Sequence, residues 1–308
     1  MVESLAGRDL ISLLDLSPEE VSGLLELAQE VKANPSRVAK ALEGKTLFMY
    51  FEKPSLRTRV TFEAGMTQLG GHAIYYTAAD GKIGVRESVE DVARNLERWV
   101  DGAMCRTFSH QLVADLARLA EIPVINGLTD LLHPCQALAD FMTLGEVKGD
   151  LAGRRLVYVG DGNNVAHSLM EAGARLGCHV TVITPEGYGP DPEVVRICSE
   201  AGADTGARIL AGTDLRMVEG ADAVYTDVWA SMGQEEEAAA RKKVFRPYQI
   251  NEEVMGWAGP DAVFLHCLPA HRGDEVTDAV ADSPSSVIFQ QAENRLHAQK
   301  AVLLSVMR

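Results

Sequence analysis

The chain carries a cluster of cations and hydroxyls in one short stretch, Phe51–Arg59, which reads FEKPSLRTR and separates an apolar run from a helical pattern. The N-terminus of a helix presents unpaired backbone N–H groups and a partial positive charge. Ser55 and Thr58 add hydroxyl donors, and Arg57 adds a planar fork of N–H donors. These residue types favour a binding site for a phosphate group, with a solvated basic helix start as the alternative. Because Arg59 faces away from Arg57 on a helix, we expect it to brace a neighbouring element.

Four more stretches place reactive side chains at the ends of expected strands or just after them. They are Ala103–Arg106 (AMCR), His133–Gln136 (HPCQ), Asp227–Gly233 (DVWASMG) and His266–Ala270 (HCLPA). Each stretch alone is weak evidence, because a single histidine or cysteine near a strand end is more often buried or satisfied than catalytic. Their combination indicates an active site, because ligands of parallel α/β sheets bind at the carboxyl ends of the strands.

The elements that must position these residues follow from the apolar pattern. Short apolar runs and helical patterns alternate twice along the chain, which predicts two parallel-sheet α/β domains. We expect strands at 46–51, 72–76, 103–106, 123–125, 155–159, 179–184, 223–226, 263–268 and 287–290. We expect helices at 57–69, 88–99, 110–120, 134–147, 165–176, 192–201 and 292–307, and one that opens at Ser17 with a capping-box glutamate at Glu20.

The segment Lys148–Gly153, KGDLAG, has no apolar stripe and marks a domain boundary. We therefore predict one domain at 1–147 and a second at 148–291. The long helix 134–147 would join them, and a C-terminal helix at 292–308 would pack back on the N-terminal domain and complete it.

Composition limits the classes of partner. The 308 residues are 46% hydrophobic and carry a formal net charge of -15, which argues against non-specific binding to nucleic acid or to an anionic membrane. No apolar run approaches the roughly 18 residues that span a bilayer, and the first residues lack the pattern of a signal peptide. The five cysteines form no CxxC pair, which fits free thiols in a reducing cytoplasm. We expect a cytoplasmic protein with no metal site.

The motifs SLRTR, HPCQ, DVWASMG and HCLPA, in this order and spacing, resemble those of the aspartate/ornithine carbamoyltransferase family over essentially the whole chain. The SMG and HCLP stretches point to ornithine as the acceptor. The resemblance implies that the side-chain amine of L-ornithine attacks carbamoyl phosphate directly, giving L-citrulline and phosphate without a cofactor, in arginine biosynthesis or catabolism. It also implies a homotrimer or a multiple of trimers. Lys82 falls where the family reaches into a neighbouring subunit's phosphate site, and a loop-tip lysine in water is the alternative.

The resemblance further implies which residues hold carbamoyl phosphate. They are Ser55, Leu56, Arg57, Thr58, Arg106, His133, Gln136, Cys267, Leu268 and Arg295. Arg106, His133 and the Thr58 hydroxyl would polarise the carbonyl, whose oxygen gains negative charge during attack. Gln136 would hold the carbamoyl NH2 group. The family usually has threonine at the position of Leu56. If the hydroxyl of that threonine binds phosphate in the family, this chain lacks one phosphate contact; if only the backbone N–H binds, the loss is small.

The same resemblance implies an ornithine site made of Asn164, Asp227, Ser231 and Met232. Asn164 and the Met232 backbone would hold the α-carboxylate, while Asp227 and Ser231 would hold the α-ammonium. The side-chain amine must lose a proton before it attacks, because its solution pKa lies near that of lysine. Cys267, with Asp227, could accept or relay this proton. Arg106, His133, Cys267 and Asp227 are thus the expected catalytic residues, and Cys267 is not expected to act as a covalent nucleophile.

Alternative functions remain open at the level of sequence. The stretch Gly160–Val165, GDGNNV, resembles the start of a dinucleotide fingerprint, although Val165 replaces its third glycine and no acidic residue ends the next strand. There are three alternatives: a nicotinamide enzyme, a non-catalytic binder of a phosphorylated metabolite, and a carbamoyltransferase for aspartate or putrescine. The SMG loop, followed by an acidic helix at 234–240, is predicted to close over the second substrate.

Overall fold

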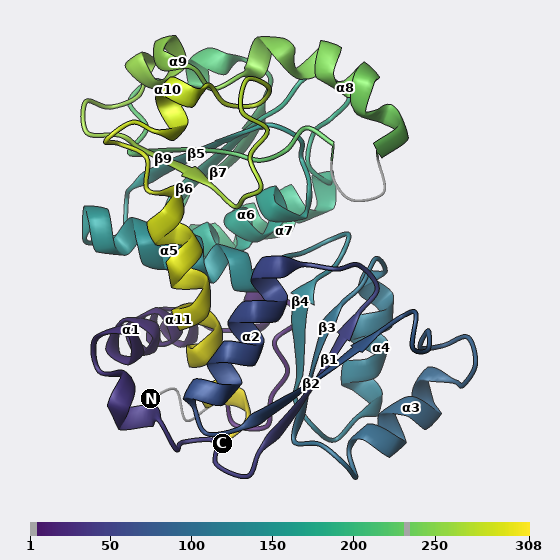
Figure 1. The fold of residues 1–308 in the computed structure, drawn as a ribbon. Helices are drawn as coiled ribbons and strands as arrows, with labels where there is room; N and C mark the ends of the chain where they lie inside the picture. The colour runs from purple at the N-terminus through teal and green to yellow at the C-terminus, as the bar shows by residue number, and fades with distance from the viewer. Residues whose placement is uncertain (1–4, 231–234) are drawn as a thin grey trace. The chain divides into compact units, whose positions relative to one another are not determined.

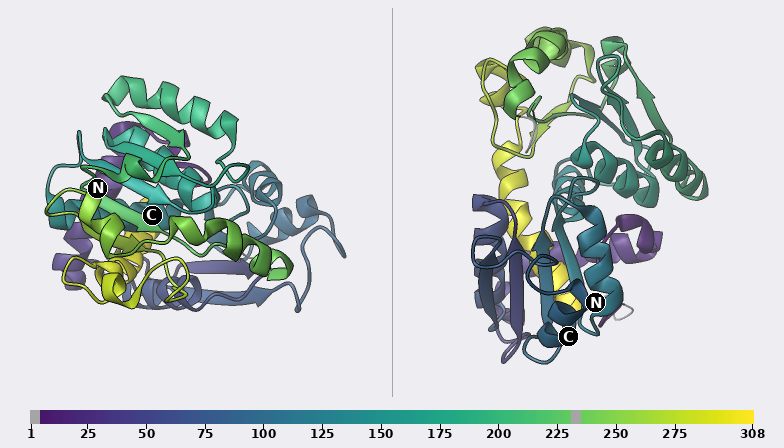
Figure 2. Two further views of the ribbon diagram at one scale, coloured as in Figure 1. Left: turned by 90° about the horizontal axis from the view of Figure 1, so that it is seen from above. Right: turned by 90° about the vertical axis from the view of Figure 1, so that its right-hand side faces the viewer.

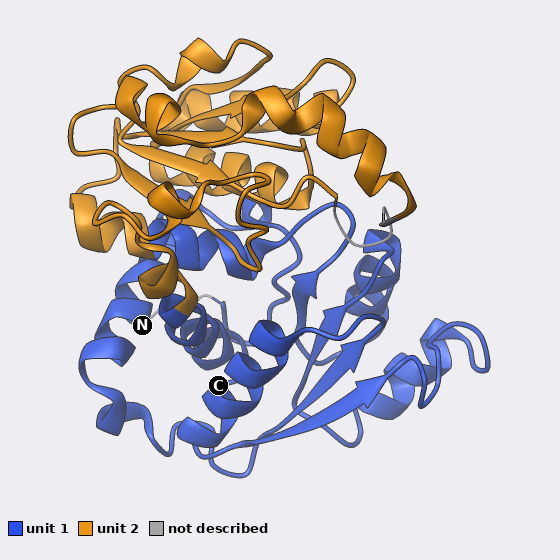
Figure 3. Cartoon of the chain, turned by 45° about the horizontal axis from the view of Figure 1, so that its top comes forward, with its two compact units in different colours: residues 1–142, 293–308 blue, residues 143–292 orange. Residues whose placement is uncertain are grey.

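The computed structural model describes residues 5–230 and 235–308. The chain divides into two compact units, residues 1–142 with 293–308 and residues 143–292 (Figure 3). Each unit contains one sheet, and every pair of adjacent strands in both sheets is parallel. The predicted class, two parallel-sheet α/β domains, is confirmed. The chain passes from one unit to the other within α5 (Pro134–Lys148) and returns within α11 (Ile288–Val306).

The first unit holds four strands, in the order β2-β1-β3-β4. The strands are β1 (Thr46–Phe51), β2 (His72–Thr77), β3 (Gly102–Arg106) and β4 (Val124–Leu128). The helices before α5 are α1 (Pro18–Ala33), α2 (Leu56–Gln68), α3 (Val89–Leu96) and α4 (His110–Leu119). Helix α1 begins where its capping box predicts, because Ser17 Oγ accepts from the Glu20 N–H at 3.2 Å and Glu20 Oε2 accepts from the Ser17 N–H at 2.9 Å.

Alternate residues of β1 face opposite sides of the first sheet. Phe48 and Tyr50 pack in a cluster with Leu96 of α3 and Leu116 of α4. Helices α2 and α11 lie on the other side of this sheet (Figure 1). Lys300 of α11 donates to Gln68 of α2 at 3.0 Å. From residue 293 onward, the C-terminal helix is therefore part of the first unit, although it lies at the other end of the sequence.

The second unit holds five strands, in the order β7-β6-β5-β8-β9. The strands are β5 (Arg155–Val159), β6 (His179–Ile183), β7 (Ile209–Gly212), β8 (Ala223–Thr226) and β9 (Val263–His266). The helices are α6 (Asn164–Leu176), α7 (Pro192–Thr205), α8 (Ala238–Phe245), α9 (Glu252–Trp257) and α10 (Asp278–Ala281). Helices α6 and α7 cover one face of the sheet, and α9 and α10 cover the other (Figures 1 and 2). No helix among the described residues is long and apolar enough to cross a membrane.

The predicted strand at Val287–Gln290 is wrong. Only an isolated bridge between Phe264 and Ser286 is present, and helix α11 already begins at Ile288. A run of only three apolar residues, Val287–Phe289, cannot distinguish a strand from the first turn of a buried helix. The neighbouring strand β9 also ends two residues earlier than predicted, because Leu268 adopts a φ of 58°, outside the extended region.

Candidate active site

The strand order of each sheet decides where the predicted site residues gather. In the first sheet the order reverses at β1 and β3, and the stretch from Ser55 to Thr58 follows β1 while Arg106 ends β3. In the second sheet it reverses at β5 and β8, which Asn163 and Asp227 follow. Ligands of doubly wound sheets bind at such switch points, outside the carboxyl ends of the strands.

The turn after β1 has the geometry of a capped helix start. Ser55 is the N-cap of α2, and its hydroxyl accepts from the Thr58 N–H at 3.4 Å. Leu56 occupies the first helical position with 77% of its surface exposed, so its side chain adds no buried contact. Arg59 lies over the ring of Tyr75 in β2, with 3.7 Å between its guanidinium carbon and the ring centroid. Its predicted bracing role is confirmed.

Two buried guanidinium groups in the first unit converge on one hydroxyl. Arg106 Nη1 and Arg295 Nη2 each donate to Thr58 Oγ1, at 3.3 Å. Arg295 Nη1 also donates to Gln136 Oε1, and Gln136 Nε2 donates to Asp140 Oδ1 at 2.7 Å. All five side chains are buried. Two cations so close together in a low-dielectric site repel one another, and a bound anion would relieve that cost.

His133 is buried next to these cations. Burial lowers the pKa of His133 well below its usual value, and the nearby Arg295, Arg106 and Arg57 lower it further. The imidazole is therefore neutral near pH 7 and can donate one hydrogen bond to an oxygen atom without carrying a charge.

This neutral imidazole makes stability depend on pH. Because the folded pKa of His133 lies below the unfolded value of 6.5, its contribution is present above pH 6.5 and is lost as pH falls through the folded pKa. We expect the difference in unfolding free energy between the wild type and His133→Asn to stay constant above pH 6.5. Below it, the difference should shift against the wild type by up to about 1.4 kcal/mol per pH unit. Urea unfolding of both proteins between pH 7.5 and 5.5 measures this, and a constant difference throughout would contradict it.

In the second unit, the turn after β5 is tied to the turn after β8. Asn163 caps α6, and its Oδ1 accepts from the N–H groups of Val165 at 2.9 Å and Ala166 at 3.2 Å. Its Nδ2 donates to Asp227 Oδ2 at 3.0 Å. Asn164, the predicted ornithine contact, is the first residue of the helix. Asn163 was missed, although an asparagine directly before a helical pattern is a strong N-cap signal.

Cys267 and Asp227, which the sequence predicts to handle the proton together, are in contact in the structure. Cys267 Sγ donates to Asp227 Oδ1 at 2.9 Å, and the same oxygen accepts from the Val228 N–H at 2.8 Å. Asp227 is buried and Cys267 is half-buried. A thiol on a carboxylate is suited to passing a proton. The predicted ornithine contacts Ser231 and Met232, and the SMG loop that contains them, lie outside the described residues.

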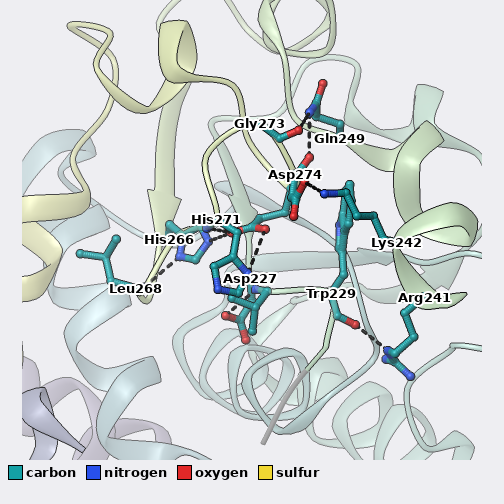
Figure 4. Close-up of polar contacts among 12 residues, drawn as sticks. Asp227, Trp229, Arg241, Lys242, Gln249, His266, Leu268, His271, Gly273 and Asp274 are labelled. Atoms are coloured by element: carbon teal, nitrogen blue, oxygen red, sulfur yellow. Dashed lines mark hydrogen bonds and ion pairs between the residues drawn. The ribbon is translucent and has the colours of Figure 1, made fainter. Parts of the chain in front are cut away.

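His266, directly before Cys267, uses both ring nitrogens inside the unit. Its Nδ1 accepts from the Leu268 N–H at 2.9 Å (Figure 4). Its Nε2 lies 3.2 Å from Glu275 Oε1. Ligand atoms of Asp227, His266 and Cys267 lie within 4.8 Å of one another. Because both nitrogens of His266 are engaged, this trio is not a ready metal site. No local sequence signal predicts a role for Glu275.

Arg241 of α8 holds the two turns of the second unit from another side. Its guanidinium pairs with Asp161 Oδ2 at 2.5 Å and donates from Nε to the Trp229 carbonyl at 2.6 Å. Burial raises the pKa of Asp161, while Arg241 opposes that shift. Beside Trp229 lies a cavity of about 430 Å³, which His271 and Glu275 also line. Through these two contacts, Arg241 links Asp161 in the turn after β5 to the backbone of Trp229 in the turn after β8.

The glycine-rich turn after β5 packs against backbone. A Cβ added at Gly162 would lie 2.2 Å from the Pro190 nitrogen and 2.3 Å from the Gly189 carbonyl carbon. Close packing within the unit thus explains the glycine without a dinucleotide.

We expect Gly162→Ala to destabilise the protein by about 1–3 kcal/mol, because backbone atoms cannot move aside as a side chain can. Gly256→Ala in helix α9 is the matched control, since a Cβ there meets nothing within 4 Å. That change should be neutral or stabilise by about 0.5–1 kcal/mol. Denaturant unfolding of the two variants measures both effects, and equal stabilities would contradict the prediction.

Comparison with known proteins identifies relatives of the whole chain. Residues 8–146 match the family model of the aspartate/ornithine carbamoyltransferase carbamoyl-P binding domain, and residues 152–306 match that of the Asp/Orn binding domain. The ornithine carbamoyltransferase of Thermococcus kodakarensis is 55% identical over 100% of this chain and 98% of its own. The solved ornithine carbamoyltransferase of Pyrococcus furiosus is 55% identical, with a TM-score of 0.95 over 98% of each chain. The Thermus thermophilus enzyme is 44% identical, with a TM-score of 0.87 over 97% of this chain and 99% of that one.

Proposed function

Because the chain belongs to the aspartate/ornithine carbamoyltransferase family, we propose that the switch point of its first unit binds carbamoyl phosphate and that of its second unit binds L-ornithine. The chain is an enzyme that transfers the carbamoyl group to the side-chain amine of ornithine, giving L-citrulline and phosphate. The main structural support for this function is that buried Arg106 and Arg295 both donate to the Thr58 hydroxyl.

The phosphate of the substrate lies at the start of helix α2. Backbone N–H groups of this turn bind it, including that of Leu56, together with the side chains of Ser55, Arg57, Thr58 and Arg106. Carbamoyl phosphate is a dianion, so it offsets the repulsion between the buried arginines of this unit. The side chain of Leu56 has no hydrogen-bond donor, so only its backbone N–H can serve this purpose.

The carbamoyl group is polarised by donors around its oxygen. Arg106, neutral His133 and the Thr58 hydroxyl point hydrogen bonds at the charge that develops during attack. Gln136, held by Arg295 and Asp140, orients the NH2 group. The Leu268 carbonyl and Cys267 are further contacts of the carbamoyl group.

The second unit binds the acceptor. Asp227 pairs with the α-ammonium, assisted by Ser231, while Asn164 and the Met232 backbone hold the α-carboxylate. Asn163 and Cys267 fix the orientation of the Asp227 carboxylate through their hydrogen bonds.

The reaction needs a neutral amine. Cys267 and Asp227 together accept or relay the proton that the side-chain ammonium releases. The amine lone pair then forms a C–N bond to the carbamoyl carbon, which passes through a tetrahedral intermediate. The C–O bond to phosphate breaks with its electron pair, and the leaving phosphate takes the remaining proton from nitrogen. No cofactor or metal enters these steps.

The chain acts in arginine metabolism, and we place it in the cytoplasm as a homotrimer or a multiple of trimers. Large apolar side chains exposed in the first unit support an assembly through that unit, and they include Leu56, Ile74, Val85 and Trp99. Lys82 would reach the neighbouring phosphate site. Within its own chain, Lys82 Nζ lies 3.9 Å from Glu52 Oε1, so this role requires it to leave a weak ion pair.

The test is product formation from carbamoyl phosphate with ornithine, aspartate or putrescine as the acceptor. We expect citrulline with ornithine, its near loss in Arg57→Ala, and a slower reaction in Cys267→Ala. Carbamoylaspartate or carbamoylputrescine as the main product would overturn the assignment of the acceptor. Binding of carbamoyl phosphate without any product would overturn the assignment as an enzyme.

A further inference from the structure

We propose that Glu275 is a positioning residue of the transfer reaction, which acts through His266 on the backbone of Leu268 and on the Cys267 thiol. The inference rests on the proposed function of this loop in carbamoyl transfer. Glu275 touches neither proposed substrate, and no local sequence signal identified it. Three linked contacts inside the second unit carry the argument.

The first contact joins two fully buried side chains. The side chains of His266 and Glu275 are 0% and 1% exposed, and His266 Nε2 lies 3.2 Å from Glu275 Oε1. A buried carboxylate is costly unless hydrogen bonds compensate for lost water. Glu275 Oε1 also accepts from the His271 N–H. The carboxylate thus clamps the ring of His266 from one side and the returning loop from the other.

The second contact determines the tautomer of His266. Its Nδ1 accepts from the Leu268 N–H at 2.9 Å, so Nδ1 carries no proton. The ring proton must therefore reside on Nε2, where it is donated to Glu275. If Glu275 were removed, the ring could turn over or place its proton on Nδ1. Either change would break the bond to Leu268.

The third contact concerns the backbone that this bond holds. Leu268 has a φ of 58° and is the one non-glycine among the described residues with a positive φ. A left-handed conformation costs a residue with a Cβ about 1–2 kcal/mol, so it needs support from its surroundings. The His266 ring supplies that support. Cys267 lies between His266 and Leu268, so the same clamp fixes its Sγ against Asp227.

The backbone of His266 is fixed as well. Its N–H donates to Gln291 Oε1 at 2.9 Å, and Gln291 Nε2 donates to the Tyr225 hydroxyl at 3.1 Å. Loss of Glu275 should therefore release the ring of His266 and the backbone after it, while strand β9 stays in place. This predicts a local effect on the loop instead of general unfolding.

The main test compares Glu275→Ala and Glu275→Gln with Asp274→Ala. Asp274 is the matched control because it is the adjacent acid and lines the same cavity, yet it pairs with Lys242 at 2.5 Å. We expect Glu275→Ala to lower kcat about 10- to 100-fold with little change in the KM for carbamoyl phosphate. Glu275→Gln, whose amide oxygen can still accept from Nε2, should recover most of the activity, and Asp274→Ala should match the wild type.

A second readout does not depend on catalysis. Burial raises the pKa of the other four cysteines to about 12, so iodoacetamide should report on Cys267, the one that is not buried. Freed from the carboxylate of Asp227, the Cys267 thiol should ionise more readily. We expect several-fold faster alkylation in Glu275→Ala and a wild-type rate in Asp274→Ala. Because alkylation does not require turnover, this readout remains valid if the acceptor is not ornithine. A failure of the proposed function can therefore be distinguished from a failure of the proposal about Glu275.

Unchanged kcat and alkylation in Glu275→Ala would overturn the proposal, as would equal losses in Asp274→Ala. If Glu275→Ala does not fold, two replacements of His266 decide the matter. His266→Asn can still accept from the Leu268 N–H, whereas His266→Gln can reach only Glu275. A higher kcat for His266→Asn supports the proposal, and equal or reversed values overturn it.

Discussion

Replacing Arg106 by methionine is expected to lower kcat/KM for carbamoyl phosphate by about 10³-fold or more. Loss of one preorganised donor to a developing oxyanion commonly costs about 10²–10³ in kcat, and Arg106 is proposed to serve both the phosphate and the carbonyl. Arg106→Lys should fall between the wild type and methionine, because it keeps the charge but loses the planar fork. Steady-state rates with varied carbamoyl phosphate measure the effect.

The same substitution should separate binding from folding. In the unliganded protein, Arg106 and Arg295 share the Thr58 hydroxyl, so removing one cation relieves repulsion and should leave the melting temperature unchanged or raised. Carbamoyl phosphate should raise the melting temperature of the wild type but much less that of Arg106→Met. Arg59→Met is the control, because Arg59 pairs with Glu63 and covers Tyr75 outside this cluster. Equal rate losses in the two variants would contradict the assignment.

Asp227→Asn is expected to lower kcat/KM for ornithine by about 10²–10³-fold. Removing one partner of a buried charge pair typically costs about 2–5 kcal/mol, and tenfold corresponds to about 1.4 kcal/mol. The change also disturbs two contacts of the free enzyme, since the carboxylate accepts from Cys267 Sγ and from Asn163 Nδ2. An asparagine can present its oxygen to only one of them. Initial rates with varied ornithine measure the loss.

The control for Asp227 is Asp222→Asn. Asp222 directly precedes strand β8, where it pairs with Arg154 at 3.0 Å and accepts from the Arg155 N–H at 2.9 Å. Its loss should lower stability while leaving the rate constants near the wild-type values. If Asp227→Asn raised the KM for carbamoyl phosphate as much as that for ornithine, its proposed role at the acceptor would be wrong.

Local sequence determined most of the secondary structure. Strand β1 and strand β5 have the predicted bounds, because apolar runs of five or six residues between polar turns are typical of buried strands. Helix α1 begins at its capping box. Local patterns failed where the apolar signal was short or weak. The edge strand β7 has two exposed residues and was not predicted, and 287–290 was assigned to a strand.

The sequence by itself also determined which residue types and motifs form the proposed site: a cationic turn, a histidine, a carboxylate and a thiol. Only the tertiary structure decided which of them meet. Thr58 contacts Arg106 because β1 and β3 are neighbours, and it contacts Arg295 because the last helix returns to the first unit. Cys267 reaches Asp227, and Asn163 rather than Asn164 supports it, because β8 lies between β5 and β9. The physical reason is that propensities and caps act over a few residues, whereas strand order and the burial of Glu275 depend on packing between segments far apart in the chain.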